Sequence, residues 1–426
     1  MRRQMLMGLL FVVAVQFRIT FAGENWPQWR GPLGTGVAAE GEYPVEFSRD
    51  EAVAWKAELP GLGTSTPAVW DDNIFVTCGI DGQDGIVCYD MAGNERWRKT
   101  LGDERPGKHR NASGSNPSPV TDGQHVVAYY KSGTLACLDA SGNEKWKTNL
   151  QNRYGEDTLW WDLGTSPVLA ENRVIVAVVH EGPSYLVAFD LSNGEEVWKT
   201  EREYDNPQEA DQAYTTPQVV RVNGEDVVVT WGADHLTGHD AATGKLLWES
   251  SGFNPNNEGY WRVIASAVIG DGIAVVPWGR GKFLTGVRVG GQGDITKSNR
   301  LWDKEGLGAD VPTAAVRDGK AYLLTDTGRI VCLELESGDE LWSHDLPKNR
   351  NKYYASPVLA GDKLYCTRED GVIFVGRLSD DGLEQLAEND MGERVIATPV
   401  PIRDGLLVRG DEHLFHISPT TSATYK

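Results

Sequence analysis

Short apolar runs alternate along this chain with polar turns, in the pattern of β-strands joined by tight connections. Ile74-Phe75-Val76, Val174-Ile175-Val176 and Val227-Val228-Val229 are rich in β-branched residues, which favour strands. Polar turns such as Asp122-Gly123 and Asp271-Gly272 stand just before strands of this kind. The pattern predicts an all-β protein.

The strands belong to a repeated unit that ends on a tryptophan. An acidic residue precedes most of these tryptophans by seven or eight residues, as Asp90 precedes Trp97 and Asp190 precedes Trp198. A turn containing Gly or Asn separates the two, and these residues supply the positive φ that a tight hairpin needs. The closing tryptophans return every 40 to 54 residues, at Trp55, Trp97, Trp146, Trp198, Trp248, Trp302 and Trp342.

The acidic residue ends one predicted strand and the tryptophan lies on the next, and two further strands come before this pair. The first of them opens with a small residue and usually a proline, as in Ser118-Pro119 and Ser166-Pro167. Each unit therefore contains four predicted antiparallel strands. A four-stranded unit that repeats about every 40 to 50 residues is typical of a β-propeller blade.

Counting the units predicts eight blades between residues 54 and 417. Seven starts run from Thr66 to Ser356, and an eighth unit begins at Thr398 but ends without its tryptophan. The missing strand is the one that contains Trp55, before the first start. We therefore expect the N-terminal strand to complete the last blade, which removes open sheet edges from the ring.

The fifth and seventh units depart from the pattern. Arg288 and Arg377 occupy the position of the acidic residue, a glycine-rich insertion precedes Trp302, and Leu386 stands where the seventh tryptophan is expected. These departures are interpreted as tolerated losses, although altered blades can also carry binding sites.

The units resemble the repeat of pyrroloquinoline-quinone-like (PQQ-like) propellers, most closely at residues 187–198 and 243–248. That family contains quinone-dependent dehydrogenases, the non-catalytic BamB-type propellers of outer-membrane assembly, and many exported proteins. The entry at residues 25–32 looks like that of exported members from planctomycete-like bacteria. The resemblance implies an eight-bladed ring and leaves the activity open, because one fold can serve many functions.

Composition narrows the range of partners. The formal net charge is −20, from 41 Lys and Arg against 61 Asp and Glu. Nucleic acid is therefore not expected as a partner, since binding phosphates needs clustered cations. The acidic balance also disfavours docking on an anionic membrane surface, and we expect a monomer.

The N-terminus has the pattern of an export signal. Two arginines precede an apolar run over residues 5–15, and the small residue Ala22 stands before a polar stretch. The run is too short to cross a bilayer as a permanent helix. We expect an exported, periplasmic or extracellular protein with a signal peptide (1–22), an N-terminal extension (23–53), the propeller (54–417) and a C-terminal tail (418–426).

Five cysteines are an odd number for an exported protein. Cys88, Cys137 and Cys332 recur at one position of the repeat, which predicts a small buried core position. Cys78 and Cys88 flank a hairpin loop, and the sequence leaves open a disulfide between them.

The site of the dehydrogenase members is not matched by motif. The resemblance implies a quinone held between a tryptophan and a disulfide of adjacent cysteines, beside a calcium bound by Glu, Asn and Asp. This chain has no adjacent cysteine pair, and no motif places the calcium ligands or a histidine metal site. We expect no catalytic residue, metal or cofactor. A PQQ- and calcium-dependent alcohol or polyol dehydrogenase is the alternative.

Aromatic and basic residues gather in the loops that join successive blades and in those between the second and third strands of a blade. Both sets of loops open on one face of the ring, so we predict a rim that binds a protein or a carbohydrate. In the alternative, the aromatic residues pack the loops and the cations pair with carboxylates. The candidates are Trp160, Trp161, Asp162, Tyr214, Trp261, Arg262, Arg280, Arg329, Tyr354 and Arg368.

The leading hypothesis is an exported, non-enzymatic binding or scaffold propeller. An outer-membrane assembly factor of the BamB type is a further alternative.

Overall fold

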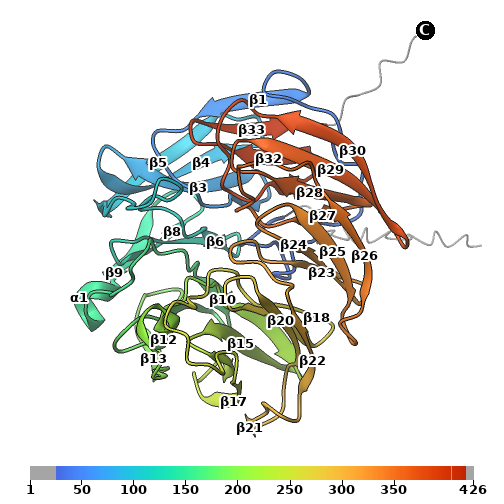
Figure 1. Cartoon of the computed structure of the whole chain (residues 1–426). Coiled ribbons are helices and arrows are strands. Elements are labelled where there is room, and N and C mark those ends of the chain that lie inside the picture. Colours follow the sequence, from blue (N-terminus) through green and yellow to red (C-terminus); the bar gives the residue numbers. More distant parts are fainter. Residues whose placement is uncertain (1–24, 404, 419–426) are drawn as a thin grey trace, which may run out of the picture.

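The computed structural model describes residues 25–403 and 405–418. Eight antiparallel sheets stand around a central axis (Figure 1), which confirms the predicted eight-bladed propeller. Each sheet has four strands except one, which gains a fifth. The predicted signal peptide, and the predicted tail beyond residue 418, lie outside the described residues.

Blades 1 to 4 follow the predicted order, from an inner strand at the axis to an outer strand at the periphery. Blade 1 contains β2 (Ala68–Trp70), β3 (Asn73–Ile80), β4 (Gln83–Asp90) and β5 (Glu95–Asp103). Blade 2 contains β6 (Val120–Thr121), β7 (His125–Tyr129), β8 (Thr134–Asp139) and β9 (Glu144–Asn149). Blade 3 contains β10 (Val168–Ala170), β11 (Arg173–Val178), β12 (Tyr185–Asp190) and β13 (Glu196–Glu201). Blade 4 contains β14 (Gln218–Val222), β15 (Glu225–Gly232), β16 (His235–Asp240) and β17 (Leu246–Ser250).

Blades 5 to 8 complete the ring. Blade 5 contains β18 (Val268–Gly270), β19 (Ile273–Trp278), β20 (Phe283–Arg288) and β22 (Arg300–Glu305). Blade 6 contains β23 (Ala315–Arg317), β24 (Lys320–Leu324), β25 (Arg329–Glu334) and β26 (Glu340–Asp345). Blade 7 contains β27 (Val358–Ala360), β28 (Lys363–Thr367), β29 (Val372–Ser379) and β30 (Gly382–Asp390). Blade 8 contains β31 (Val400–Ile402), β32 (Gly405–Arg409), β33 (His413–Ile417) and β1 (Val53–Glu58). Two short helices, α1 (Leu150–Tyr154) and the 3-10 helix η1 (Gln208–Asp211), lie in loops between blades.

The N-terminal strand closes the ring as predicted. β1 pairs antiparallel with β33, and Trp55 lies opposite His416. In Figure 1 the blue β1 lies beside the red β33, so the two ends of the propeller meet within one blade.

A belt of tryptophan contacts, here called the outer latches, joins blades at the periphery. Trp146 of blade 2 donates its indole N–H to the carbonyl oxygen of Leu191 in blade 3 at 2.9 Å. Its ring lies over Gly194, where a Cβ atom would come within 2.5 Å of the indole. Five such bonds occur in the ring. In each, the indole N–H donates to the backbone carbonyl oxygen of the residue that follows the acidic residue of the next blade. The pairs are Trp55–Met91, Trp97–Ala140, Trp146–Leu191, Trp198–Ala241 and Trp302–Leu335.

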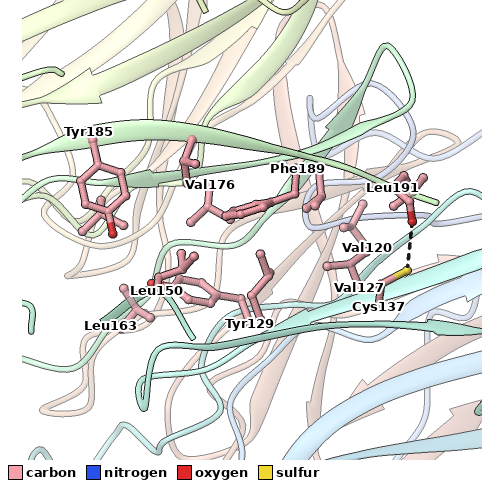
Figure 2. Packing of buried hydrophobic residues seen from close by; sticks show 14 of the residues in the cluster. Val120, Val127, Tyr129, Cys137, Leu150, Leu163, Val176, Tyr185, Phe189 and Leu191 are labelled. Atoms are coloured by element: carbon pink, nitrogen blue, oxygen red, sulfur yellow. Dashed lines mark hydrogen bonds between the residues drawn. The ribbon is translucent and has the colours of Figure 1, made fainter. Parts of the chain in front are cut away.

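Apolar side chains fill the space between neighbouring blades behind these latches. Figure 2 shows Val127 and Tyr129 of blade 2 facing Val176 and Phe189 of blade 3. In the same layer the Cys137 thiol lies 3.6 Å from the Leu191 carbonyl oxygen. The packing explains why each blade needs a neighbour on both sides, since one sheet alone cannot bury its faces.

The cysteines occupy core positions. Cys137 lies directly opposite Trp146 across the β8–β9 ladder, Ala188 lies opposite Trp198, and Gly238 lies opposite Trp248. The indole ring covers this position and leaves room only for a small side chain. All five cysteines are buried and free, and Cys78 lies opposite Gly85 rather than Cys88, so the disulfide left open by the sequence does not form.

The two irregular blades lack the turn that receives an outer latch. In blade 5 the glycine-rich insertion instead forms β21 (Gly293–Asp294), which pairs in parallel with β17 beside Trp248. Within the described residues the indole N–H of Trp248 has no hydrogen-bond partner. In blade 7, β29 and β30 continue as a long hairpin, and Leu383 covers Gly376.

Candidate functional site: an axial cup

A ring of eight hydroxyl side chains surrounds the axis, one from the start of each blade. In seven steps the backbone N–H of one member donates to the hydroxyl oxygen of the next, as from Ser118 to Ser166 at 2.9 Å. Between blades 8 and 1 the buried Arg409 takes this place and donates to the Ser65 carbonyl oxygen at 3.0 Å. The members of this hydroxyl ring are Thr66, Ser118, Ser166, Thr216, Ser266, Thr313, Ser356 and Thr398.

Residues 25–38, here called the floor segment, cross the axis beneath the hydroxyl ring. The Pro27 carbonyl oxygen accepts from Thr121 N–H in blade 2, and that of Thr35 accepts from Val316 N–H in blade 6. Blades 2 and 6 stand opposite each other in an eight-membered ring. A segment bonded to both must therefore pass through the centre and close the axial channel at that end.

A fully buried arginine anchors the floor segment. Arg30 is 1% exposed and donates to the carbonyl oxygens of Pro357 at 2.7 Å and Ala314 at 2.8 Å. Burial lowers its pKa to about 9, which still leaves the guanidinium charged at neutral pH. Gly36 makes this contact possible, because a Cβ atom there would collide with the guanidinium.

Above the floor lies a cavity of about 680 Å³, here called the axial cup. Trp29 of the floor segment and the hydroxyl ring line it, together with Trp161 and Tyr354 of the blade-joining loops. Its volume lies within the range of roughly 300–1,000 Å³ that is usual for small-molecule sites. The open end faces the same side as the loops that join successive blades, and we call this side the mouth face.

Paired charges stiffen one wall of the cup. Arg262 lies 3.3 Å from a Glu209 carboxylate oxygen and 3.4 Å from an oxygen of Asp310. Arg280 approaches the same Asp310 oxygen at 3.7 Å. Glu209 in turn accepts the Trp161 indole N–H at 2.6 Å, so the wall is a connected network.

A buried ion pair holds the neighbouring part of this wall. The Lys131 ammonium lies 2.5 Å from Asp162, and the two side chains are 4% and 2% exposed. Asp162 also accepts the backbone N–H groups of Lys108 and His109. Burial alone would raise the pKa of Asp162, but Lys131 and the two amides outweigh it and hold that pKa below its ordinary value. Asp162 therefore ties two mouth-face loops together.

Asp326 completes the set of carboxylates that line the cup. It accepts the backbone N–H groups of Asp310 at 2.7 Å and Val311 at 3.1 Å. Burial raises its pKa despite these amides. It therefore holds the blade 5–6 loop in place at the wall.

The candidate residues divide between the cup and its surroundings. Arg368 is 5% exposed in its side chain and bound to Asp370 at 2.8 Å, and Arg329 pairs with Glu340 at 3.2 Å. Trp160 stands 44% exposed at the rim, whereas Trp261 packs against Trp278. Six candidates do line the cup, namely Trp161, Asp162, Tyr214, Arg262, Arg280 and Tyr354.

Sequence reasoning missed several lining residues. The hydroxyl ring was visible as a small residue at the start of each blade, but it was interpreted as a strand-start signal alone. Trp29 lies in the extension outside the repeat, and His109 and Lys352 belong to loops without a motif. The recurrence of Ser or Thr in all eight starts was the signal that could have identified the ring.

A calcium–quinone pair does not fit the cup. Calcium prefers six to eight oxygen ligands, yet the three carboxylates that line the cup already bind cations or backbone amides. The Asn116 side-chain oxygen accepts from Thr64 and Ser113. Among the described residues of the lining there is no glutamate and no cysteine.

A cluster of Glu393, Glu412 and His413 lies away from the cup in blade 8. One Glu393 oxygen accepts the backbone N–H groups of Glu412 and His413, and the other pairs with the His413 ring at 2.7 Å. These bonds give the cluster a structural role at the start of β33.

The blades, the outer latches and the closed cup define an eight-bladed PQQ-like β-propeller. A family model described as outer membrane protein assembly factor BamB matches residues 82–277 and 285–394. The chain belongs to this family.

Individual relatives agree with this assignment. BamB from Bordetella pertussis is 24% identical over 365 residues, which cover 84% of this chain and 83% of the relative. The structure of BamB from Moraxella catarrhalis aligns with a TM-score of 0.62 at 15% identity, over 87% of this chain and 98% of that one. A europium-containing methanol dehydrogenase aligns with a TM-score of 0.66 at 12% identity, over 92% and 90%. At these identities the structural likeness shows the fold alone.

Proposed function

We propose that this chain is an exported, non-catalytic binding propeller that receives its partner on the mouth face, over the axial cup. The observation that carries the proposal is a ligand-sized cup with one closed end and a rim of exposed aromatic side chains. A rigid ring can present loops from several blades to one partner without reorganising, which lowers the entropic cost of binding.

Exposed apolar side chains favour the mouth face as the binding surface. Outside the strands, five large apolar side chains are 44% to 74% exposed, namely Leu33, Leu62, Trp160, Trp161 and Tyr260. Leu33 belongs to the floor segment, and the other four lie in loops that join blades. Aromatic side chains of this kind are enriched where proteins bind other proteins, and their flat faces also suit sugars. Within the described chain, no helix is long and apolar enough to cross a bilayer.

Matched variants on the two faces test this proposal. Binding partners are captured from the cell envelope, and a glycan array is screened, with the wild type and with Trp160→Ala/Tyr260→Ala. The control is Leu33→Ala, a 74%-exposed residue of the floor segment on the opposite side. We expect the double variant to lose binding and the control to keep it. Equal binding by all three proteins would contradict a mouth-face site.

The pairing of the basic side chains changes which rim variants are useful. Replacing Arg368 with an acidic residue would remove the cation that pairs with Asp370 and put a second negative charge beside it, which would disturb the loop. Arg329 is exposed and its reversal is therefore the cleaner probe of rim charge.

Outer-membrane protein assembly is the second candidate, favoured by the match to the BamB family model. In this role the partner on the mouth face would be a protein of the assembly machinery. The test is to delete the gene and quantify β-barrel proteins in the outer membrane. A fall in their amount supports the role, and unchanged amounts remove it.

Quinone chemistry ranks below both because the lining carboxylates are engaged elsewhere. We expect added pyrroloquinoline quinone with calcium to leave the thermal unfolding midpoint unchanged. A clear upward shift would restore the dehydrogenase alternative.

A further inference from the structure

The hydroxyl ring has hydrogen-bonding capacity that the fold does not use. Seven members accept a backbone N–H of the preceding blade. Across residues 25–403 and 405–418, none of the eight hydroxyl groups donates to a protein acceptor, although seven of them are 2% to 4% exposed. Because all eight members line the cup, a ligand there can accept these hydrogen bonds.

Aromatic surface lies next to this polar ring. Trp29 forms part of the floor, and Trp161 and Tyr354 stand in the walls. Trp161 is 44% exposed, and its edge-to-face contact with His109 at 6.0 Å supports its orientation. The cup therefore offers a ligand both flat apolar faces and a closely spaced set of hydroxyl groups.

The charges of the lining favour a neutral ligand. Arg262 and Arg280 both meet Asp310, and Asp162 meets Lys131 behind the wall. An anion would have to compete with carboxylates that already hold these guanidinium groups. The charged residues of the lining balance in number, with Arg262, Arg280 and Lys352 against Asp162, Asp310 and Asp326.

We propose that the axial cup binds the end of a neutral carbohydrate chain. A sugar ring has apolar C–H faces, which stack on aromatic side chains, and a rim of hydroxyl groups that both donate and accept. Stacking would use Trp29, Trp161 or Tyr354, and the sugar oxygens would accept from the hydroxyl ring. The paired Arg262 and Asp310 would bond to sugar hydroxyl groups with their remaining donors and lone pairs. This inference rests on the proposed function and names the ligand class of the same face.

The test uses the full chain and neutral hexasaccharides of four kinds, namely cellohexaose, xylohexaose, hexa-N-acetylchitohexaose and maltohexaose. Hexagalacturonate serves as the anionic comparison. Affinity is measured by titration calorimetry and by quenching of tryptophan fluorescence. We expect at least one neutral hexasaccharide to bind, and hexagalacturonate to bind more weakly.

Two matched pairs of variants locate the site. Thr313→Val removes one hydroxyl of the ring, whereas Thr313→Ser keeps it. Trp161→Ala removes a wall of the cup, whereas Leu33→Ala removes an exposed apolar side chain on the opposite side of the ring, outside the cup. We expect Thr313→Val and Trp161→Ala each to weaken binding about tenfold, which corresponds to one lost hydrogen bond or stacking contact. Both controls should stay near the wild type, and thermal unfolding checks that every variant is folded.

The outcomes separate this inference from the proposed function. If all four neutral sugars fail while a protein partner still binds the mouth face, the carbohydrate inference is overturned and the proposed function stands. Preference for hexagalacturonate, or unchanged affinity in both Thr313→Val and Trp161→Ala, overturns it as well. If neither a sugar nor a protein binds the mouth face, both fail.

Discussion

The periphery and the axis of this propeller respond differently to irregular repeats. At the periphery the outer latch is lost where blades 5 and 7 lack the acidic turn, and the Trp248 indole N–H has no hydrogen-bond partner in the described chain. At the axis the hydroxyl ring runs through the same blades without a gap, from Thr216 to Ser266 at 3.0 Å and from Thr313 to Ser356 at 3.0 Å. The architecture tolerates a missing latch because apolar packing still joins the blades. The retained hydroxyl positions are those that line the cup.

The largest expected loss of stability at the periphery comes from removing a complete latch. Trp146→Ala deletes a ring that is 8% exposed together with its bond to Leu191. We expect the free energy of unfolding to fall by about 3–5 kcal/mol, as for other large buried aromatic residues. Denaturant unfolding followed by circular dichroism measures this loss. Trp160→Ala, on the exposed rim, should change the value by no more than about 0.5 kcal/mol. Similar losses for the two would contradict a latch role.

Glycine under the latch is the next test. Gly194 and Gly272 both have φ of +75°, so alanine is strained at either position. A methyl carbon added at Gly194 would come within 2.5 Å of the Trp146 indole, whereas one added at Gly272 would meet open space. We expect Gly272→Ala to cost about 1–2 kcal/mol for the backbone and Gly194→Ala a further 1–3 kcal/mol or so for overpacking. Equal unfolding midpoints for the two variants would show that the Trp146 indole moves aside without a cost in stability.

Acid should weaken the latch between blades 3 and 4. His239 is buried beside the Gly244 turn that receives Trp198, and burial lowers its pKa to about 4, with Arg202 adding to the effect. The native state keeps His239 neutral, whereas the unfolded chain binds a proton below about pH 6.5. Stability is therefore complete above pH 6.5 and falls toward pH 4, by up to about 1.4 kcal/mol per pH unit. Comparing unfolding at pH 7 and pH 5 for the wild type and His239→Phe checks this, and the same pH loss in both proteins would contradict it.

The smallest expected effect is the loss of the latch hydrogen bond alone, with an aromatic ring kept in place. Trp146→Phe and Trp248→Phe both keep an aromatic ring, but only Trp146 loses a bonded N–H. We expect Trp146→Phe to cost about 1 kcal/mol more than Trp248→Phe. Equal costs in denaturant unfolding would mean that the ring contact alone matters.

The sequence predicted what is local to a blade. The turn between Asp190 and Trp198 determines a hairpin by itself, because the glycine φ and the carboxylate bonds lie within a few residues. The number of blades, the closing strand at Trp55 and the irregular units followed from counting such turns. Each is a property of the repeat, and repetition makes a weak local signal reliable.

The site depends on contacts that the repeat does not encode. Arg30 reaches Pro357 across 327 positions of the chain, and no local pattern anticipates that bond. Ion pairing could not be predicted from the sequence either, because Arg368 and Asp370 are held together by a loop conformation rather than by a motif. Six of the ten candidates line the cup because they lie in loops that border it, whereas no motif pointed to the floor that gives the cup its depth.

The path of the floor segment has a consequence for how the chain assembles. Residues 25–38 leave the ribosome before any blade, yet they bond to Thr121, Val316 and Leu359. The last of these belongs to blade 7, so the segment cannot complete its contacts until nearly the whole chain has been synthesised. β1 pairs later still, since its partner β33 is the last strand of the described chain. Residues 25–38 are therefore among the last parts of the described chain to reach their native place, and the cup gains its floor only when the ring is nearly complete.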